Sequence, residues 1–197
     1  WTSFWKYTYL CGDGNDSCGN WVNLSANIPA NRPTTFDNFN AQGGYDLLVK
    51  VKPDEPNVVF IGGTNLWRST DGFTSDSNTV QIGGYFEGSD HGYGNWDIYS
   101  KHHPDQHDLL FLPSDNNIIL SANDGGVYKS TNCMASPHLW QSLNNGYQTT
   151  QLYSVNFGKG TSDLIIGGFQ DNGNFVTISD DETESWVMPF NGDGCYS

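Results

Sequence analysis

The chain is poor in helix-forming residues and in positive charge. Among its 197 residues there are five alanines, four glutamates and eight lysines or arginines, against 18 aspartates, 21 asparagines and 23 glycines. Alanine and glutamate are strong helix formers, whereas glycine, asparagine and aspartate favour turns. The composition therefore argues against a mainly helical protein and favours strands joined by tight turns.

The same shortages exclude two kinds of partner. A formal charge of -14 leaves too few cations to neutralise the phosphates of a nucleic acid. No apolar run approaches the roughly 20 residues that a membrane-spanning helix needs. Aromatic residues make up 14% of the chain, so its acidity is not that of a disordered tail. We expect a folded acidic protein without a nucleic-acid partner or a membrane span.

Only two of the four cysteines lie close together in the sequence. Cys11 and Cys18 flank the flexible segment Gly-Asp-Gly-Asn-Asp-Ser, which makes a local disulfide plausible. A four-thiolate metal site is less favoured because there is no second close pair. Cys133 and Cys195 are expected to be buried or paired with groups outside the chain. Together with the many Trp and Tyr residues, this favours an extracellular or cell-surface protein.

Three passages of the sequence repeat one arrangement: a short aliphatic strand, a Gly/Asn/Asp turn and a strand with an aromatic residue. They cover residues 57–72, 117–132 and 163–179. A strand is expected before each passage, at 45–51, 108–112 and 152–157, and another after it, at 80–85, 139–143 and 186–190. Four strands per repeat is the pattern of β-propeller blades.

The predicted fold is all-β, a partial β-propeller of four-stranded antiparallel blades. We expect a blade end at 1–30, whole blades at about 44–86, 106–145 and 150–190, and the start of another blade at 191–197. A β-sandwich with similar hairpins is the alternative. Propellers need typically 4–8 blades, and the chain begins at Trp1 without a signal-peptide pattern. We therefore interpret residues 1–197 as one segment of a larger propeller, or as a processed chain. Its edge strands, 4–10 and 186–197, should contact the remaining blades or neighbouring subunits.

One turn resembles a known motif. Ser69-Thr70-Asp71-Gly72 resembles the Asp-box, or BNR, hairpin of sialidases, sortilins and family-74 glycoside hydrolases. The aspartate can accept N–H bonds within its own turn, and the glycine permits positive φ. Ser69, Asp71 and Gly72 are therefore expected to be structural.

A longer stretch, residues 102–194, resembles secreted bacterial BNR-repeat proteins, many of which carry a C-terminal sorting domain. The passages that carry the resemblance include His103-Pro-Asp-Gln-His107, Asn123-Asp-Gly-Gly-Val-Tyr-Lys-Ser130, Gly167-Gly-Phe-Gln-Asp-Asn-Gly173 and Gly192-Asp-Gly194. The resemblance implies a propeller and secretion more clearly than it implies a reaction.

Blade geometry assigns many polar residues to one face, where the turns between second and third strands meet the connections between blades. These residues are Asn65, His103, Asp105, His107, Asn123, Asp124, Gln151, Gln170, Asp171, Asn172 and Asp193. Each alone is an ordinary turn residue, but their joint placement favours function. The candidates for ligand binding are Gln170, Asn172 and two aromatic residues of a Gly-rich insertion, Tyr93 and Trp96. Such rings can stack on sugars or cover a blade edge.

A metal site is a further hypothesis. His103, Asp105 and His107 are spaced i, i+2, i+4 and share a face if the segment is extended. Two imidazoles and a carboxylate would suit a transition metal, although a hydrogen-bonded cluster against Asp124 is the alternative. Calcium is a separate option because Asp and Asn oxygens are abundant.

Two functions stay open. The favoured one is a surface-exposed binding or scaffold module, for glycans or within a surface assembly. The alternative is an inverting glycoside hydrolase with two of Asp124, Asp171 and Asp193 about 6.5–9.5 Å apart as acid and base. The turn Asn123-Asp-Gly-Gly resembles one in which family-74 enzymes carry a catalytic aspartate. A sialidase is excluded because its arginine cluster cannot be built from Arg32 and Arg68 alone.

Overall fold

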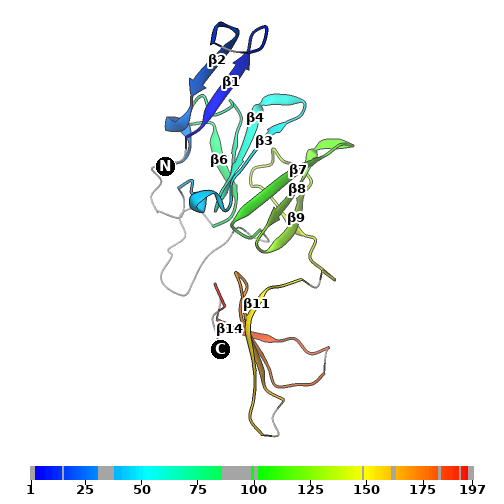
Figure 1. The fold of residues 1–197 in the computed structure, drawn as a ribbon. Coiled ribbons are helices and arrows are strands. Elements are labelled where there is room, and N and C mark those ends of the chain that lie inside the picture. Colours follow the sequence, from blue (N-terminus) through cyan, green and yellow to red (C-terminus); the bar gives the residue numbers. More distant parts are fainter. Residues whose placement is uncertain are drawn as a thin grey trace. The chain divides into compact units, whose positions relative to one another are not determined.

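A computed structural model describes most of the chain as strands and turns (Figure 1). The described residues are 3–14, 16–30, 38–85, 99, 102–147, 149–160, 163–181, 183–190 and 192–194. The chain divides into unit 1, Trp1–Ser89 with Ile98–Leu143, and unit 2, Asp90–Asp97 with Asn144–Ser197. We describe each unit by itself.

Unit 1 contains one hairpin and two four-stranded antiparallel sheets. The hairpin is β1 (Trp5–Tyr9) and β2 (Gly19–Asn23), with the 3-10 turns η1 (Asp16–Cys18) and η2 (Ser25–Asn27) beside it. After η4 (Gln42–Gly44), the first sheet is formed by β3 (Leu48–Lys52), β4 (Glu55–Gly62), β5 (Leu66–Ser69) and β6 (Thr79–Gly83). The second is formed by β7 (Gln106–Leu112), β8 (Asp115–Asn123), β9 (Gly126–Ser130) and β10 (Gln141–Ser142).

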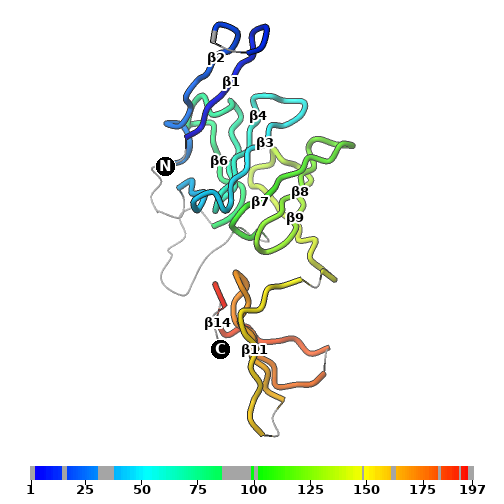
Figure 2. The backbone as a smooth tube through the Cα atoms, viewed as in Figure 1, coloured from blue at the N-terminus to red at the C-terminus, as the bar shows by residue number. Residues whose placement is uncertain are grey.

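Unit 2 contains the third four-stranded sheet, again in the order of the chain. Its strands are β11 (Leu152–Phe157), β12 (Ile165–Phe169), β13 (Gly173–Thr177) and β14 (Val187–Phe190). In each sheet the backbone runs up and down, so that every strand pairs with its neighbours in sequence (Figure 2). The three predicted groups of four antiparallel strands are therefore confirmed, and none of the four sheets closes on itself. The arrangement of these sheets around a propeller axis stays a prediction.

The two sheets of unit 1 pack against each other through one apolar core. The first sheet contributes Leu48, Val58, Phe60, Leu66 and Ile82, and the second sheet with its loops contributes Leu109, Phe111, Ile119, Tyr128, Cys133 and Trp140. The rings of Phe60 and Phe111 meet edge to face with their centroids 5.6 Å apart. The indole N–H of Trp140 donates to the carbonyl of Ile82 at 2.6 Å, so the second sheet is also hydrogen-bonded to the first.

Strand β4 is buried on both faces. Val58 and Phe60 belong to the core between the sheets, whereas Val59 and Ile61 pack with Ile28, Trp67 and Phe73 on the opposite face. Alternate side chains of a strand point to opposite faces, so a continuous Val-Val-Phe-Ile run serves two cores. The hairpin segment contributes to the second core through Phe4, whose ring lies 5.3 Å from that of Phe73.

Of the cysteine predictions, the Cys11–Cys18 disulfide is confirmed and closes the loop between β1 and β2. Cys133 is a free thiol in the core, one of the outcomes expected for it. Cys195 lies outside the described residues. In the described part of the chain, no helix has the length and apolar character to cross a membrane.

The turn after β5 is held together by the side chain of Asp71. Ser69 Oγ donates to Asp71 Oδ1 at 2.8 Å, and Ser75 Oγ and Asn78 Nδ2 donate to Asp71 Oδ2 at 2.7 and 3.0 Å. Gly72 follows with a φ of 68°, which a glycine adopts without strain. Partial burial opposes ionisation, but the hydrogen bonds from these side chains hold the pKa of Asp71 well below its ordinary range.

We predict that Asp71→Ala destabilises the protein at neutral pH. Three donors lose a charged acceptor, so the free energy of unfolding should fall by about 1–3 kcal/mol in urea titrations. A depressed pKa stabilises the fold above the unfolded value, so the difference from wild type should shrink as the pH falls below about 4. Asp76→Ala, at an exposed position of the same turn, is the control. Equal losses in both variants would contradict the prediction.

The segment before β7 takes part in a network of buried, hydrogen-bonded polar side chains. The amide of Gly84 donates to His102 Nδ1 at 3.2 Å, and His102 Nε2 then donates to Ser121 Oγ at 3.0 Å. Ser121 in turn donates to Gln106 Oε1 at 3.1 Å, and Gln106 Nε2 donates to the carbonyl of His103 at 2.9 Å. Burial lowers the pKa of His102, in agreement with the neutral imidazole that this chain of bonds requires.

A second buried histidine, His138, has no such network. Its side chain is 5% exposed beside Trp140, and neither ring nitrogen has a hydrogen-bond partner among the described residues. Burial and the nearby charge of Arg68 lower the pKa of His138 to about 4. The imidazole is therefore neutral in the folded protein at neutral pH.

We predict a loss of stability in mild acid that depends on His138. The unfolded chain binds a proton near pH 6.5 and the folded chain near pH 4, so unfolding is favoured as the pH falls through this window. The expected contribution of this group is about 3 kcal/mol. Urea unfolding between about pH 7 and pH 4.5 should show a smaller pH dependence for His138→Phe than for wild type. The same pH dependence in both would refute the assignment.

Candidate functional site

Four segments of unit 1 meet at one end of its two sheets. The amide of Asp105 donates to the carbonyl of Thr64 at 2.9 Å, which joins the segment before β7 to the turn between β4 and β5. The amide of Asp124, in the turn between β8 and β9, donates to the carbonyl of Asp105 at 3.3 Å. Gln42, in the segment before β3, contacts Thr64 and Asp105 through its side chain. These segments are of the two kinds that the repeat pattern assigned to one face: turns between the second and third strands of a sheet, and connections that lead into a first strand.

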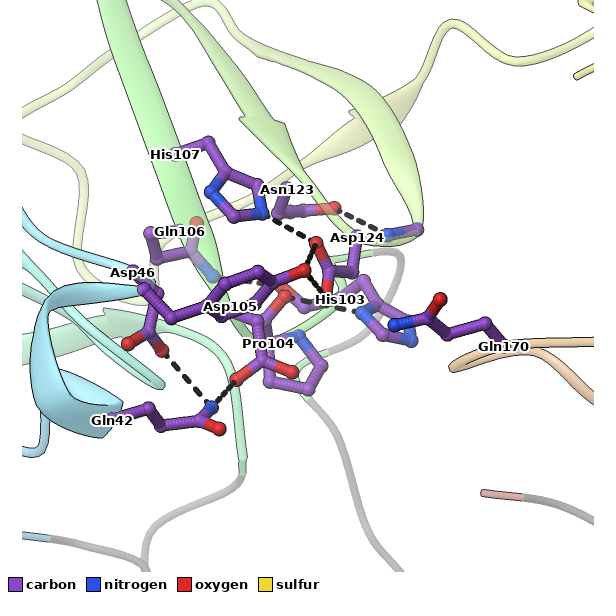
Figure 3. Close-up of polar contacts among 12 residues, drawn as sticks. Gln42, Asp46, His103, Pro104, Asp105, Gln106, His107, Asn123, Asp124 and Gln170 are labelled. Atoms are coloured by element: carbon purple, nitrogen blue, oxygen red, sulfur yellow. Dashed lines mark hydrogen bonds and ion pairs between the residues drawn. The ribbon is translucent and has the colours of Figure 1, made fainter. Parts of the chain in front are cut away.

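The amide nitrogen of Gln42 lies at the centre of this cluster. It donates to Asp105 Oδ1 at 2.5 Å, to Asp46 Oδ2 at 3.1 Å and to Thr64 Oγ1 at 3.3 Å. Figure 3 shows the carboxylates of Asp46 and Asp105 directed towards this nitrogen. An amide nitrogen carries two hydrogens, so three acceptors, two of them carboxylates, share one neutral donor.

Asp46 is the most deeply buried of these acids. Its side chain is 0% exposed, and Asp105 is 9% exposed. Burial raises the pKa of Asp46, against the opposing effect of hydrogen bonds from its own backbone and from Gln42. The ion pairs of the described residues do not include Asp46, since Lys50 pairs with Asp108 and Lys52 with Asp54.

Asp124 connects the buried pair to the surface. Tyr45 Oη donates to both of its oxygens, at 3.2 and 3.0 Å. His107 Nε2 contacts its Oδ1 (Figure 3). The rings of Tyr45 and His107 are perpendicular, with centroids 5.1 Å apart. One carboxylate oxygen of Asp124 lies within 4.8 Å of one of Asp105. Tyr45 is 55% exposed and the His107 side chain 37%, so a phenol ring and an imidazole lie together at the surface, over an Asp124 side chain that is only 9% exposed.

The predicted group of His103, Asp105 and His107 does not converge. Asp105 has a φ of 63° and β7 begins only at Gln106, so the extended segment that would align the three side chains is not formed. His103 Nδ1 donates to the carbonyl of Pro104 at 3.1 Å, whereas His107 contacts Asp124 and Asp105 contacts Gln42. The alternative of a hydrogen-bonded cluster against Asp124 fits His107.

The other predicted residues divide into turn residues and residues that the structure leaves out. Asn65 is fully buried and its Oδ1 accepts from the amide of Tyr85 at 2.7 Å, while Asn123 Oδ1 accepts from the amide of Gly125 at 3.1 Å. Both side chains therefore stabilise turns. Tyr93 and Trp96 lie outside the described residues.

In unit 2 the predicted residues form a hydrogen-bonded turn between β12 and β13. The amide of Gln170 donates to the carbonyl of Gln151 at 2.9 Å, and Asn172 Nδ2 donates to the carbonyl of Gln170 at 2.8 Å. The amide of Asp171, whose φ is 58°, donates to Asp193 Oδ1 at 3.2 Å. The arrangement accounts for these side chains as turn residues, and their ligand-binding and catalytic roles stay predictions.

Three residues of the site were missed from the sequence: Gln42, Tyr45 and Asp46. The predicted strand 45–51 placed the latter two within a sheet, but β3 begins at Leu48 because the chain turns through η4. The signal was present in Gly43-Gly44, a pair typical of a turn. Within its repeat the segment also occupies the position that 103–105 occupies in the next one.

Neither a protein-family model nor a curated protein matches the chain. The resemblance to BNR-repeat proteins thus stays a proposal.

We predict that Gln42→Leu lowers the free energy of unfolding by about 1–2 kcal/mol, because Asp46 and Asp105 lose their shared donor. Gln141→Leu, at an exposed position of β10, gives the matched control and should be near neutral. Chemical unfolding at neutral pH measures both. A Gln42→Leu variant as stable as the control would show that the carboxylates do not depend on this amide.

Proposed function

We propose that the chain is part of an extracellular or cell-surface β-propeller of the BNR/Asp-box type. It acts as a binding or scaffold module, and its binding surface is the polar end of unit 1. The alternative, an inverting glycoside hydrolase, is less well supported.

The packing of unit 1 supports the propeller. Both of its sheets run up and down in chain order and share one core. Their first strands, β3 and β7, are joined by an ion pair between Lys50 and Asp108 at 2.7 Å. In a propeller, successive sheets pack face to face and their first strands line the central channel. The described residues form three four-stranded sheets, fewer than the 4–8 blades of typical propellers, so further blades are proposed to complete the ring.

Exposed apolar strands support a role within an assembly. In the hairpin of unit 1, Trp5, Tyr9 and Trp21 are 48%, 61% and 64% exposed. In unit 2, Val187 and Phe190 of the edge strand β14 are 64% and 70% exposed. Large exposed apolar side chains in groups are typical of surfaces that contact other protein, here the remaining blades or neighbouring subunits.

The single observation that carries glycan binding is the surface group Tyr45, His107 and Asp124. A half-exposed tyrosine ring can stack on a sugar, and the partly exposed imidazole of His107 beside it can bind hydroxyl groups. The hydrogen bonds of Tyr45 and His107 to Asp124 hold the three side chains in place.

The two acids that lie together in unit 1, Asp105 and Asp124, do not have the spacing of an inverting pair. Carboxylate oxygens of Asp105 and Asp124 lie within 4.8 Å, closer than the roughly 6.5–9.5 Å that an inverting mechanism uses to accommodate water. Asp46 is fully buried and does not reach a substrate.

The proposal predicts that the intact protein binds a soluble β-glucan without releasing reducing ends. Tyr45→Ala should weaken binding about tenfold in calorimetry, which corresponds to about 1.4 kcal/mol. Tyr147→Ala, at a tyrosine with a similar exposure of 58%, is the matched control and should bind as wild type.

Equal affinity of the wild type and Tyr45→Ala, or no affinity of the wild type, would overturn glycan binding at this surface. Release of reducing ends that Asp124→Asn abolishes would establish the hydrolase instead.

A further inference from the structure

One contact between the two sheets of unit 1, here called the joint, consists of Trp140, Ile82, His102 and His138. The indole N–H of Trp140, just before β10, donates to the carbonyl of Ile82 in β6 at 2.6 Å. The indole is stacked on the ring of His102, with centroids 4.1 Å apart, and contacts the ring of His138 at 4.8 Å. The two histidines are 0% and 5% exposed. Two titratable rings are therefore enclosed where the sheets meet.

His102 can bind a proton only at a nitrogen that already accepts a hydrogen bond. The amide of Gly84 donates to its Nδ1 at 3.2 Å, and its Nε2 donates to Ser121 Oγ at 3.0 Å. A β-carbon at Gly83 would lie 2.4 Å from Nδ1, so the ring lies directly against the end of β6 while the indole covers it. A proton on Nδ1 would face the N–H of Gly84, donor against donor. The enclosed ring can gain a new acceptor only if the two sheets separate.

His138 has no acceptor in the closed joint. Both of its ring nitrogens are buried without a hydrogen-bond partner among the described residues. The charge that acts on it is that of Arg68 in β5, a guanidinium that is itself only 5% exposed. A protonated His138 would therefore be a second buried cation beside the first, which is costly in a medium of low polarity.

The surroundings of the two rings offer no negative charge to balance a proton. The other titratable or charged groups around them are Arg68, Tyr99, His103, Tyr128 and Cys133. Each of these is neutral or positive in mild acid. The ion pairs of the described residues place no carboxylate against either ring.

We propose that His102 and His138 make the joint acid-sensitive, so that it holds the sheets together at neutral pH and opens when both imidazoles bind protons. Opening releases the segment before β7, because His102 is bonded through Ser121 to Gln106, which in turn bonds the backbone of that segment. The segment carries Asp105, so the acid form loses the polar end of unit 1, whether or not that end binds a glycan.

The pKa shifts have the sign that this joint requires. Burial lowers the pKa of His138 to about 4 and that of His102 well below its ordinary value. In the open form both rings meet water and bind protons near pH 6.5. The closed form is therefore fully favoured above about pH 6.5 and loses stability as the pH falls towards 4. Each proton bound on opening favours the open form about tenfold per pH unit, so two protons favour it about a hundredfold.

The test is hydrogen exchange at the Trp140 indole N–H, followed by NMR in the intact protein between about pH 6 and pH 5. After correction for the intrinsic exchange rate, its protection should fall about a hundredfold per pH unit in the wild type. In His138→Phe or His102→Gln the fall should be about tenfold. The amide of Asp105, which donates to the carbonyl of Thr64, should lose protection in parallel.

His107→Gln is the matched control. It removes an imidazole of the same unit whose side chain is 37% exposed and can bind a proton without separating the sheets. The fall in protection should be at least as steep in this variant as in the wild type. If His102→Gln fails to fold, the comparison of His138→Phe with the wild type decides the proposal.

The proposal is overturned if protection of the indole does not fall in acid, or if it falls equally in the wild type and in His138→Phe. A fall of only about tenfold per pH unit in the wild type would leave a single histidine and refute the two-proton joint. Unchanged protection of the Asp105 amide while the indole opens would refute release of the polar end.

Discussion

The structure of unit 1 depends on the contact between its two sheets. Phe60 and Phe111 meet across the core, and the Trp140 indole donates to the backbone of the first sheet. Because this contact fixes one sheet on the other, the turn after β4 and the segment before β7 are held at hydrogen-bonding distance. The acidic cluster is a consequence: Asp46, Asp105 and Asp124 come from three separate segments, and the packing of the sheets brings them together.

The cluster also shows what a rigid framework can hold in place. Gln42 and Asp105 both have positive φ, at 43° and 63°, conformations that cost energy for residues other than glycine. Asp46 adds a buried carboxylate with a raised pKa. Such costs are tolerated where the surrounding structure is over-determined, and they are typical of sites that bind a ligand. By contrast, the buried polar groups around His102 are hydrogen-bonded to one another.

The sequence predicted the strands of the fold better than it predicted the residues of the candidate site. The alternation of aliphatic runs and Gly/Asn/Asp turns predicted the three groups of four strands, because strand pairing between chain neighbours is a local property. Within unit 1, the turn after β4, the segment before β7 and the turn after β8 do meet, whereas one polar face shared by all repeats stays a prediction. Asp46 could not be found in this way, since its role arises from burial against Asp105, which is 59 residues later in the sequence numbering. The grouping of His103, Asp105 and His107 failed because one left-handed residue breaks the alternation on which it was based.

Because β4 is buried on both faces, the pattern of apolar residues alone does not determine its register. A shift by one residue exchanges Val58 and Phe60 with Val59 and Ile61, and both sets are apolar, so either register would satisfy the two cores. The strand's last residue excludes one of the two shifts, the one that would bring Ile61 to its position. A side chain at Gly62 would approach Leu48 Cγ to 2.7 Å and Gln106 Cβ to 2.9 Å. The position therefore accepts only a residue without a β-carbon, and the absence of a side chain there lets β4 approach both Leu48 of β3 and Gln106 at the start of β7.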